Sequence, residues 1–335
     1  MVNIKDVAKK AGVSVTTVSH VINKTRFVSE ELQTKVKDVM KELDFHPNVM
    51  AGSLRRKKTS TIGLIVPDNS NQLFAELSKE VEDILFRSGY SVMLCNSAYD
   101  FKRELAHINT LRSKSVDGMI IVPTTQQVEH INRLVESNLP VVVMDRMLPE
   151  AKADIVLIDN FQGTHDAAEY LIKLGHSNIG YIDRPFDLPH SVDRFMGYKK
   201  VLEENGLAFQ EDLIVRGGFN YDDGAKAMDF LLDRKPMPTG VLAFNDITAL
   251  GAMRRIQDSG LRVPEDISVI GFDDIPQSDY TFPRLTTVHF PRKRMAEAAC
   301  KLLFRRIKGL ASEQKKEVIL SLHLEVRESA SRVRI

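Results

Sequence analysis

The amino-acid sequence predicts an α/β protein with a small N-terminal domain of three helices and a core of two doubly wound parallel-sheet lobes. The chain has 335 residues, which is too long for one ordinary hydrophobic core. Up to residue 60 the apolar residues recur at helical spacing, and from Thr61 they gather in strand-length bursts separated by amphipathic helices. The first 60 residues hold 12 lysines and arginines against 6 acidic residues, whereas the remaining 275 hold 34 against 39. A basic head on a slightly acidic body suggests that the head binds a polyanion.

A first helix is predicted from the start of the chain. The apolar side chains of Ile4, Val7, Ala8 and Ala11 fall on one helical face. Gly12 follows them directly, and glycine readily takes the left-handed conformation that ends a helix. We therefore expect a short helix that closes in a tight turn.

The next segment, "AGVSVTTVSHVIN" at residues 11–23, is rich in side chains that favour strands, because seven of its thirteen residues are β-branched. The spacing nevertheless favours a helix. Val18, Val21 and Ile22 recur at i, i+3 and i+4 after Ser14, which is a good N-cap residue. When these three side chains turn inward, the outer surface of the helix carries Val15, Thr16, Ser19, His20 and Asn23.

A third helix is predicted to begin after Ser29, another good N-cap residue, and to end before Pro47. Its apolar face would consist of Leu32, Val36, Val39, Met40 and Leu43. Two short helices joined by a turn that contains glycine, with a third helix behind them, form a helix-turn-helix unit.

The second helix of such a unit lies in the major groove of DNA with its N-terminal residues facing base edges. The predicted outer surface suits that role, because hydroxyl and amide groups bond bases or phosphates and methyl groups contact thymine. An ordinary solvent-facing helix would carry lysine and glutamate there. The small, stiff side chains of the second helix therefore predict a DNA-reading element. The alternative is a three-helix cap without a DNA role.

Residues 48–56 can form one or two helical turns that lead into four consecutive basic residues, Arg55 to Lys58. A charge run alone is usually a solvated surface, but beside a helix-turn-helix it is typical of a linker that follows the phosphate backbone. Leu54 is a large apolar side chain with no core of its own in this segment. We expect it to act as a wedge in the minor groove.

The rest of the chain alternates strand-length apolar bursts with amphipathic helices. Near-continuous valine, isoleucine and leucine runs joined by helices indicate parallel sheets that are covered on both faces. The eight bursts are "TIGLIVP", "YSVMLCN", "DGMIIVP", "LPVVVMD", "DIVLIDN", "NIGYID", "GVLAFND" and "ISVIGFDD".

Eight bursts would suffice for one closed barrel, but two features favour two open sheets. Only "RMLPEAKA" separates the fourth burst from the fifth, with no helix between them. The tail, with "LTTVHFP", a helix near residues 292–308 and "EVILSLHLEV", resembles a chain that crosses back between lobes. We expect a headpiece at 1–47, a hinge helix and linker at 48–60, and a core at 61–335, with lobe one at about 61–160 plus 291–320 and lobe two at about 161–290 plus 321–335.

Several classes of protein are disfavoured. No apolar run reaches the roughly 18 residues of a membrane span, and the N-terminus has no apolar signal core, so we expect a cytoplasmic protein. Cys95 and Cys300 both lie in apolar patterns, which predicts free thiols. An enzyme is disfavoured because no phosphate-binding glycine motif and no nucleophile elbow occur. The nine histidines show no metal-ligand spacing, so we expect neither cofactor nor metal.

Polar residues follow several of the bursts. Ligands of doubly wound sheets bind at the carboxyl ends of strands, and paired Asp, Asn and Arg side chains suit the vicinal hydroxyls of a sugar. Phe74 or Phe219 would stack on its apolar face. The alternative is that strand-end Asp and Asn residues are helix N-caps, an interpretation at least as good for Asp246. The polar residues at these ends are Asp68, Asn69, Asp145, Arg146, Asn245, Asp246 and Asp273.

The chain resembles the lactose-repressor (LacI) family along its whole length, and especially its purine- and ribose-repressor branch. The headpiece segment "IKDVAKKAGVSVTTVSHVINKTRFVSEEL" is similar nearly residue by residue. Further ordered matches are "NVMAGSL", "TIGLIVPDNSN", "KSVDGMII", "GHSNIGYI", "RFMGYKKVL", "AFNDITALGAM", "GLRVPEDISVIGFDDI" and "PRLTTVHFP".

The resemblance implies a homodimer that binds operator DNA, with an effector between the two lobes of a core similar to periplasmic sugar-binding proteins. Thr16, His20 and Asn23 match positions that contact the major groove, and Leu54 matches the hinge leucine of the minor groove. The expected DNA contacts are Val15, Thr16, Thr17, Ser19, His20, Asn23, Arg26, Leu54 and Arg55. The effector positions that the resemblance implies are Phe74, Asp145, Arg194, Phe219, Asn245 and Asp273.

Two positions depart from the family pattern. Val15 stands where relatives often have threonine or another polar residue, which affects operator preference. The hinge reads "AGSL" where "ARSL" is common, and Gly52 inside a helix costs roughly 1 kcal/mol relative to alanine. We therefore predict a hinge that folds only on DNA. The effector is expected to be a sugar or sugar derivative, and the alternatives are a nucleobase or a phosphoprotein corepressor.

A ligand-binding module of the exported sugar-binding type is another alternative. The absence of a signal segment and the basic head of 60 residues both argue against it.

Overall fold

The computed structural model describes residues 2–23, 26–45, 58–183, 189–312 and 314–333. The chain divides into two compact units, Met1–Thr59 and Ser60–Ile335. The predicted hinge at residues 48–56, with Leu54 and Arg55, lies outside the described residues, as does most of the loop before Arg194. None of the helices in the described part of the chain combines the length and apolarity that crossing a bilayer requires.

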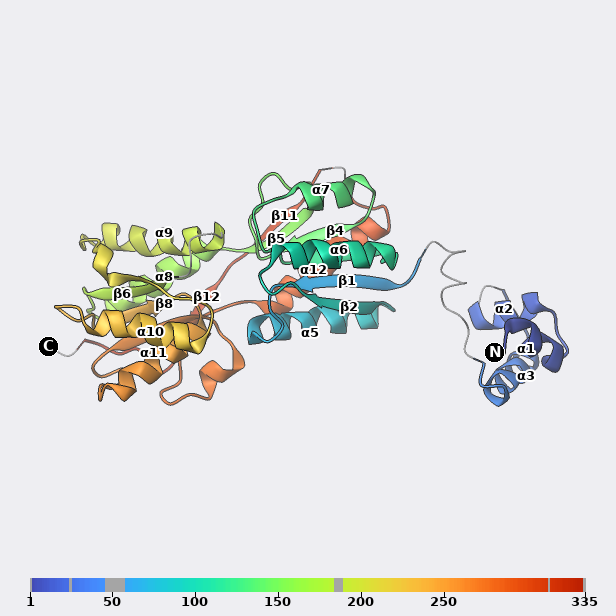
Figure 1. The fold of residues 1–335 in the computed structure, drawn as a ribbon, viewed down its shortest axis with the longest axis horizontal. Coiled ribbons are helices and arrows are strands. Elements are labelled where there is room, and N and C mark those ends of the chain that lie inside the picture. Colours follow the sequence, from blue (N-terminus) through green and yellow to red (C-terminus); the bar gives the residue numbers. More distant parts are fainter. Residues whose placement is uncertain (1, 24–25, 46–57, 184–188, 313, 334–335) are drawn as a thin grey trace. The chain divides into compact units, whose positions relative to one another are not determined.

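The first unit contains three helices (Figure 1), α1 (Ile4–Ala11), α2 (Val15–Asn23) and α3 (Glu30–Glu42). Their core is small: Val7, Val18 and Val36 are fully buried, with Ala11 and Val21 beside them. The β-branched second segment is thus a helix, as its spacing predicted, because three inward side chains share one face.

The helix ends of this unit show why the chain folds locally as predicted. Gly12 ends α1 with φ +67°, in the left-handed region that glycine enters without steric cost. The Oγ atom of Ser14 accepts a hydrogen bond of 3.0 Å from the amide of Thr17, so Ser14 caps α2. Ser29 occupies the N-cap position of α3, but its side chain makes no capping bond. The prediction was therefore right about where α3 begins and wrong about what its serine hydroxyl does.

The second unit contains two six-stranded sheets. The first sheet is wholly parallel, with the strand order β11-β5-β4-β3-β1-β2. Its strands are β1 (Thr61–Val66), β2 (Ser91–Asn96), β3 (Gly118–Ile121), β4 (Val141–Met144), β5 (Asp154–Ile158) and β11 (Glu317–Leu320). Its helices are α5 (Gln72–Arg87), α6 (Phe101–Ser113), α7 (Glu129–Glu136) and α12 (Arg292–Ile307).

Alternate residues of the four inner strands, β1, β3, β4 and β5, bury opposite faces of this sheet. Leu64 and Val142 pack with α5 and α12, whereas Ile65 and Val143 pack with α6 and α7. Burial on both faces explains why the strands read as continuous apolar runs. We call this sheet with its four helices lobe one.

The second sheet has the order β12-β10-β9-β8-β6-β7, and we call it, with its helices, lobe two. Helices α8 and α9 cover one face, and α10 and α11 cover the other (Figure 1). Its strands are β6 (Ile179–Asp183), β7 (Ile214–Arg216), β8 (Gly240–Ala243), β9 (Ser268–Asp273), β10 (Thr286–His289) and β12 (His323–Glu325). Its helices are α8 (Asn160–Lys173), α9 (Pro189–Glu204), α10 (Tyr221–Leu232) and α11 (Asp246–Asp258), with 3₁₀ turns η1 (Glu211–Leu213) and η2 (Pro276–Asp279).

Three connections join the lobes, and they confirm two open sheets instead of one barrel. The chain crosses between β5 and α8, between β10 and α12, and between β11 and β12. β4 and β5 are neighbours without a helix between them, as "RMLPEAKA" suggested. One detail differs from the all-parallel prediction: β12 pairs with β10 in the antiparallel direction. The two residues between β11 and β12 carry the chain directly from one sheet to the edge of the other.

Both cysteines are free, as expected. Cys300 lies on α12 and is buried, and burial raises the pKa of its thiol to about 12. Cys95, on β2, is only partly buried.

Candidate functional site

The outer surface of α2 carries short polar and methyl-bearing side chains. Val15 and Thr16, in the first turn, are exposed, and Val15 retains 40% of its accessible surface. Ser19 and His20 are half-buried one turn later. The first turn therefore points its small side chains away from the core of the headpiece, as a groove-reading helix requires.

Two of the predicted DNA contacts also have structural bonds within α2. The hydroxyl of Thr17 lies 2.9 Å from that of Ser14 and completes the helix cap. The amide of Asn23 donates to the carbonyl oxygen of Ser19, at 2.9 Å, and to its hydroxyl. Thr17 is half-buried, so it supports the helix end more than it presents a surface.

Arg26 follows α2 and is exposed. Its neighbour Phe27 keeps 95% of its surface accessible. An exposed cation directly after the helix suits a phosphate contact. The predicted contacts Leu54 and Arg55 lie outside the described residues.

The second group of predicted site residues lies at the carboxyl ends of the core strands. Asp145 follows β4 with φ +59°, and Asp273 ends β9 with φ +113°. The next residue, Asp274, has φ +53°. Left-handed conformations are uncommon for residues other than glycine, and they gather where a structure holds side chains for binding.

Arg194, on α9, is the centre of this group. Its Nε donates to Oδ1 of Asn160 at 2.8 Å, and its Nη1 donates to the carbonyl oxygen of Phe244 at 2.6 Å. Its Nη2 lies 3.8 Å from Oδ1 of Asp273. The guanidinium carbon also lies 3.4 Å from the ring centre of Phe272. Hydrogen bonds and an aromatic face thus fix the plane of the guanidinium.

The electrostatics of this group follow from burial. Burial lowers the pKa of Arg194, and the carboxylates of Asp273 and Asp145 oppose that effect. Burial also raises the pKa of Asp273 well above its ordinary value, although the charge of Arg194 counteracts it. The charge of Asp145, in lobe one, therefore acts on residues of lobe two.

Asp145 forms an ion pair with the adjacent Arg146, and both side chains are almost wholly buried. Within the described part of the chain, Oδ1 of Asp145 and Nε of Arg146 have no hydrogen-bond partner. One free acceptor and one free donor side by side suit a ligand group that both donates and accepts, such as a hydroxyl. We call Asp145, Arg146, Arg194 and Asp273 the strand-end cluster.

Asn245 and Asp246 have different roles after the end of β8, where the sequence left helix capping and effector binding as alternatives. Asn245 is the N-cap of α11, because its Oδ1 accepts a 2.8 Å bond from the amide of Thr248. Asp246 is fully buried and does not cap the helix. It accepts bonds from the amide of Ile275 and the hydroxyl of Ser278, at 2.8 and 2.7 Å, and from the hydroxyl of Thr287. Capping was therefore the wrong interpretation for Asp246, which joins α11 to the segment after β9.

The two predicted aromatic contacts have different surroundings. Phe219 precedes α10, and its ring stacks on that of Tyr99 of lobe one with ring centres 4.6 Å apart. Phe74 lies in the first turn of α5, is 4% exposed, and packs in the hydrophobic core.

Three residues that contact the predicted ones were not predicted from the sequence, namely Asn160, Tyr99 and Arg292. Asn160 ends the burst "DIVLIDN", so the strand-end rule that found Asp145 would also have found it. Tyr99 and Arg292 carry no comparable signal, because their partners lie far away in sequence.

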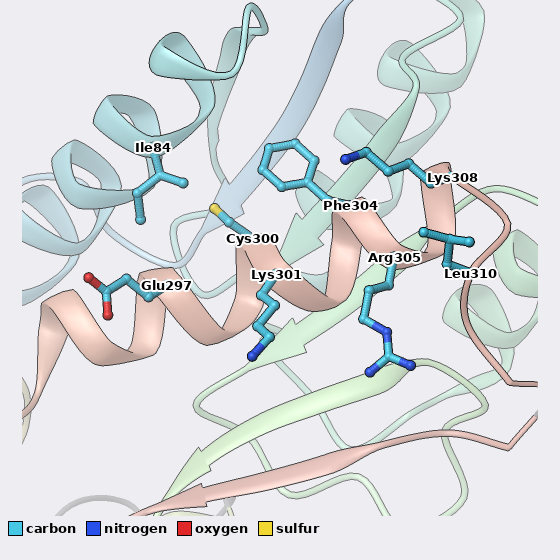
Figure 2. Close-up of a pocket in the computed structure, with 8 residues that line it drawn as sticks. All are labelled: Ile84, Glu297, Cys300, Lys301, Phe304, Arg305, Lys308 and Leu310. Carbon is cyan, nitrogen blue, oxygen red and sulfur yellow. The ribbon is translucent and has the colours of Figure 1, made fainter.

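A separate groove lies on lobe one between α5 and α12 (Figure 2). It has a volume of about 370 Å³, and an apolar floor that includes Ile84, Cys300 and Phe304. Lys301 and Lys308 are the exposed cations among its lining residues.

Comparisons with known proteins agree with this architecture. The model of bacterial regulatory proteins of the lacI family matches residues 3–48, and that of the periplasmic binding protein-like domain matches residues 168–330. The HTH-type transcriptional repressor PurR of Vibrio atlanticus is 39% identical over 333 residues, which make up 99% of this chain and 98% of the relative.

Two solved structures extend the likeness to three dimensions. The lac repressor dimer bound to operator and the anti-inducer ONPF matches with a TM-score of 0.86 and 28% identity, over 98% of this chain and 99% of the other. A LacI family transcriptional regulator from Enterococcus faecium with bound ribose matches with a TM-score of 0.74 and 32% identity, over 82% and 100%. These proteins are regulators and not enzymes. The chain belongs to the lacI family of bacterial regulatory proteins and is a DNA-binding transcriptional regulator with an effector-binding core.

Proposed function

We propose that the protein is a cytoplasmic repressor that binds an inverted-repeat operator as a homodimer. The exposed first turn of α2, held by the cap at Ser14, is the observation that carries this proposal. In a two-fold dimer, two such helices lie about one or two DNA turns apart and read symmetric half-sites. Val15 and Thr16 are the side chains most open to base edges.

Leu54 is proposed to enter the minor groove at the operator dyad, next to its counterpart from the second subunit. Inserted apolar wedges kink the duplex, and a pyrimidine–purine step is the easiest to deform. We therefore expect a CG step at the centre of the operator. Arg55 and the basic residues after it would follow the phosphates and make binding sensitive to salt.

Exposed apolar side chains on both lobes support a dimer through the core. Phe86, at the end of α5, keeps 72% of its surface, and Leu94, on the edge strand β2, keeps 46%. In lobe two, Tyr280 and Phe282 keep 89% and 91%. A second copy of the chain would cover these side chains, and apolar surface of this kind marks protein interfaces.

The effector is proposed to be a sugar or sugar derivative bound between the lobes at the strand-end cluster. The cluster offers carboxylates and guanidiniums in equal number, which suits a neutral polyhydroxyl ligand better than a charged one. Phe219 and Phe74 would meet its apolar face, and Asn245 would contribute its amide nitrogen. The bound ribose in the Enterococcus faecium regulator makes a pentose the first ligand to test.

Two alternative effectors each have an observation in their favour. A nucleobase is favoured by the relatives named PurR. A phosphoprotein corepressor is favoured by the groove between α5 and α12, because exposed Lys301 and Lys308 beside an apolar floor suit an acidic protein surface (Figure 2).

Selection of bound DNA from random oligonucleotides tests the proposal. The full chain is used alone and with D-ribose, with guanine, or with a phosphorylated phosphocarrier protein. We expect an inverted repeat with a central CG step, and only ribose should change its enrichment. A response to guanine or to the phosphoprotein would replace the sugar as effector. A lack of palindromic enrichment at moderate salt in every arm would refute the DNA-binding proposal.

A further inference from the structure

The turn after β9 holds the most constrained part of the strand-end cluster. Asp273 and Asp274 are two successive residues with left-handed φ angles. Within lobe two, the buried carboxylate of Asp246 holds the next amide, that of Ile275, at 2.8 Å. This turn sets where the carboxylate of Asp273 lies relative to Arg194. Such a backbone persists only when surrounding contacts fix it.

The same turn is also held by a residue of lobe one. Nη1 of Arg292 donates to the carbonyl oxygens of Asp273, at 3.1 Å, and Asp274, at 2.7 Å. Arg292 is the first residue of α12, which packs against α5 and the lobe-one sheet (Figure 1). The guanidinium of Arg292, a residue of lobe one, therefore holds the backbone of Asp273, a predicted effector residue of lobe two.

Residues that flank the other interlobe connections bond the turn after β9 or Arg194. His289, the last residue of β10 before the second crossing, bonds the carboxylate of Asp274 at 2.6 Å. Arg327, which follows β12 after the third crossing, bonds the other oxygen of that carboxylate at 2.7 Å. Asn160, at the first crossing, accepts from Arg194. The turn after β9 and Arg194 are therefore hydrogen-bonded to residues that flank all three connections between the lobes.

We propose that Arg292 is a positioning residue that couples effector occupancy to α12, because its guanidinium ties the Asp273–Asp274 turn to the first turn of that helix. The proposal rests on an effector bound at the strand-end cluster. A ligand shifts a conformational equilibrium only through its different affinity for the two arrangements. Arg292 supplies a contact through which a change at Asp273 reaches lobe one, which carries Phe86 and Leu94 of the proposed dimer interface.

Hydrogen exchange on the ligand-free full chain provides the first test, with Arg292→Ala compared with Arg294→Ala. Arg294 lies in the same helical turn and is exposed, so its variant removes the same charge without touching the turn after β9. We expect Arg292→Ala to accelerate exchange at residues 274–279 and 292–296 by at least about tenfold, because a charge-assisted bond to two carbonyls is lost. Arg294→Ala should match the native chain. Native exchange in Arg292→Ala at both segments would overturn the proposal.

The second test measures operator affinity with and without D-ribose, at ribose concentrations that saturate each variant. In the native chain and in Arg294→Ala, ribose should change operator affinity by the same factor. In Arg292→Ala this factor should fall to near one while ribose still binds by calorimetry. Arg292→Lys keeps a donor and should restore part of the response, which a role in stability alone would not require. A full ribose response in Arg292→Ala contradicts the coupling. If ribose binds none of the variants, the sugar proposal fails and the exchange measurement still decides the role of Arg292.

Discussion

The DNA-reading helix and the strand-end cluster prepare their side chains for ligands in opposite ways. On α2, Val15 and Thr16 are exposed, Thr17 bonds the capping residue Ser14, and Asn23 bonds Ser19 of the same helix. In the core, Arg194 and Asp273 are at most 5% exposed, and Arg194 is bonded to segments up to 50 residues away. The exposed side chains of α2 can thus fit the groove of DNA. The charged side chains of the core are already held in place by hydrogen bonds and burial without a ligand. Mutations on α2 should therefore change operator affinity with little effect on the free energy of unfolding. Mutations in the strand-end cluster should change both effector affinity and the free energy of unfolding.

The largest effect is expected from Arg194→Met. Removal of the Arg194 guanidinium leaves the oxygens of Asn160 and Phe244 without their donor and Asp273 without its counter-charge. The free energy of unfolding should therefore fall by about 3–5 kcal/mol. Ribose affinity should fall by at least about 100-fold, because bonds to a charged group are lost. Urea unfolding and calorimetry measure the two quantities.

Arg254→Met is the matched control. The side chain of Arg254 is 76% exposed and pairs with Asp258 on the surface of α11. We therefore expect the free energy of unfolding to change by no more than about 0.5 kcal/mol. Equal losses in both variants would show that burial of Arg194 does not matter.

The next effect concerns the buried carboxyl of Asp246. Burial raises its pKa to about 7, partly offset by the hydroxyl and amide donors around it. A folded-state pKa above the unfolded value means that the stability contributed by this group is full at low pH and is lost as pH rises through about 7. Between about pH 4 and pH 7, the free energy of unfolding of the native chain should therefore fall by up to about 4 kcal/mol relative to that of Asp246→Asn. Urea unfolding at a series of pH values tests this, and Asp258→Asn, on the surface of the same helix, should show the native slope.

On α2 the expected effect is on binding alone. Thr16→Ala should weaken operator binding by about tenfold, which is within the 1–3 kcal/mol of one base contact. Its free energy of unfolding should stay within about 0.5 kcal/mol of the native value, because Thr16 is exposed. Thr34→Ala removes the same groups from α3, where the hydroxyl of Thr34 donates to the carbonyl oxygen of Glu30, and should bind the operator normally. Fluorescence anisotropy with a labelled operator measures both variants.

The smallest effect separates two serines in equivalent positions. Ser14→Ala should destabilise the headpiece by about 1 kcal/mol, because the amide of Thr17 loses its acceptor. Ser29→Ala removes a hydroxyl that makes no capping bond and should change stability by less than about 0.5 kcal/mol. Thermal unfolding of the headpiece, followed by circular dichroism, distinguishes them. A larger loss for Ser29→Ala would contradict the assigned cap.

Local signals explain why so much of the fold was predictable. The period of Val18, Val21 and Ile22 was sufficient to identify α2 in spite of its β-branched composition. Gly12 and Ser14 marked its borders, because their effects act within a few residues. Likewise the missing helix between β4 and β5 was visible as a short spacer, and it distinguished two open sheets from a barrel.

The sequence by itself determined the helix-turn-helix, the alternation of strands and helices, and the strand ends at which polar side chains would gather. Only the tertiary structure decided which of those polar groups meet. Arg194 bonds Asn160, which lies 34 residues away in sequence, and Arg292 bonds the carbonyl oxygen of Asp273. Both bonds depend on packing that no local sequence pattern encodes. It also decided that Asn245 caps α11 while Asp246 holds Ile275. The physical reason is range: periodicity and capping depend on neighbours within a turn or two, whereas burial and ion pairing depend on how distant segments pack.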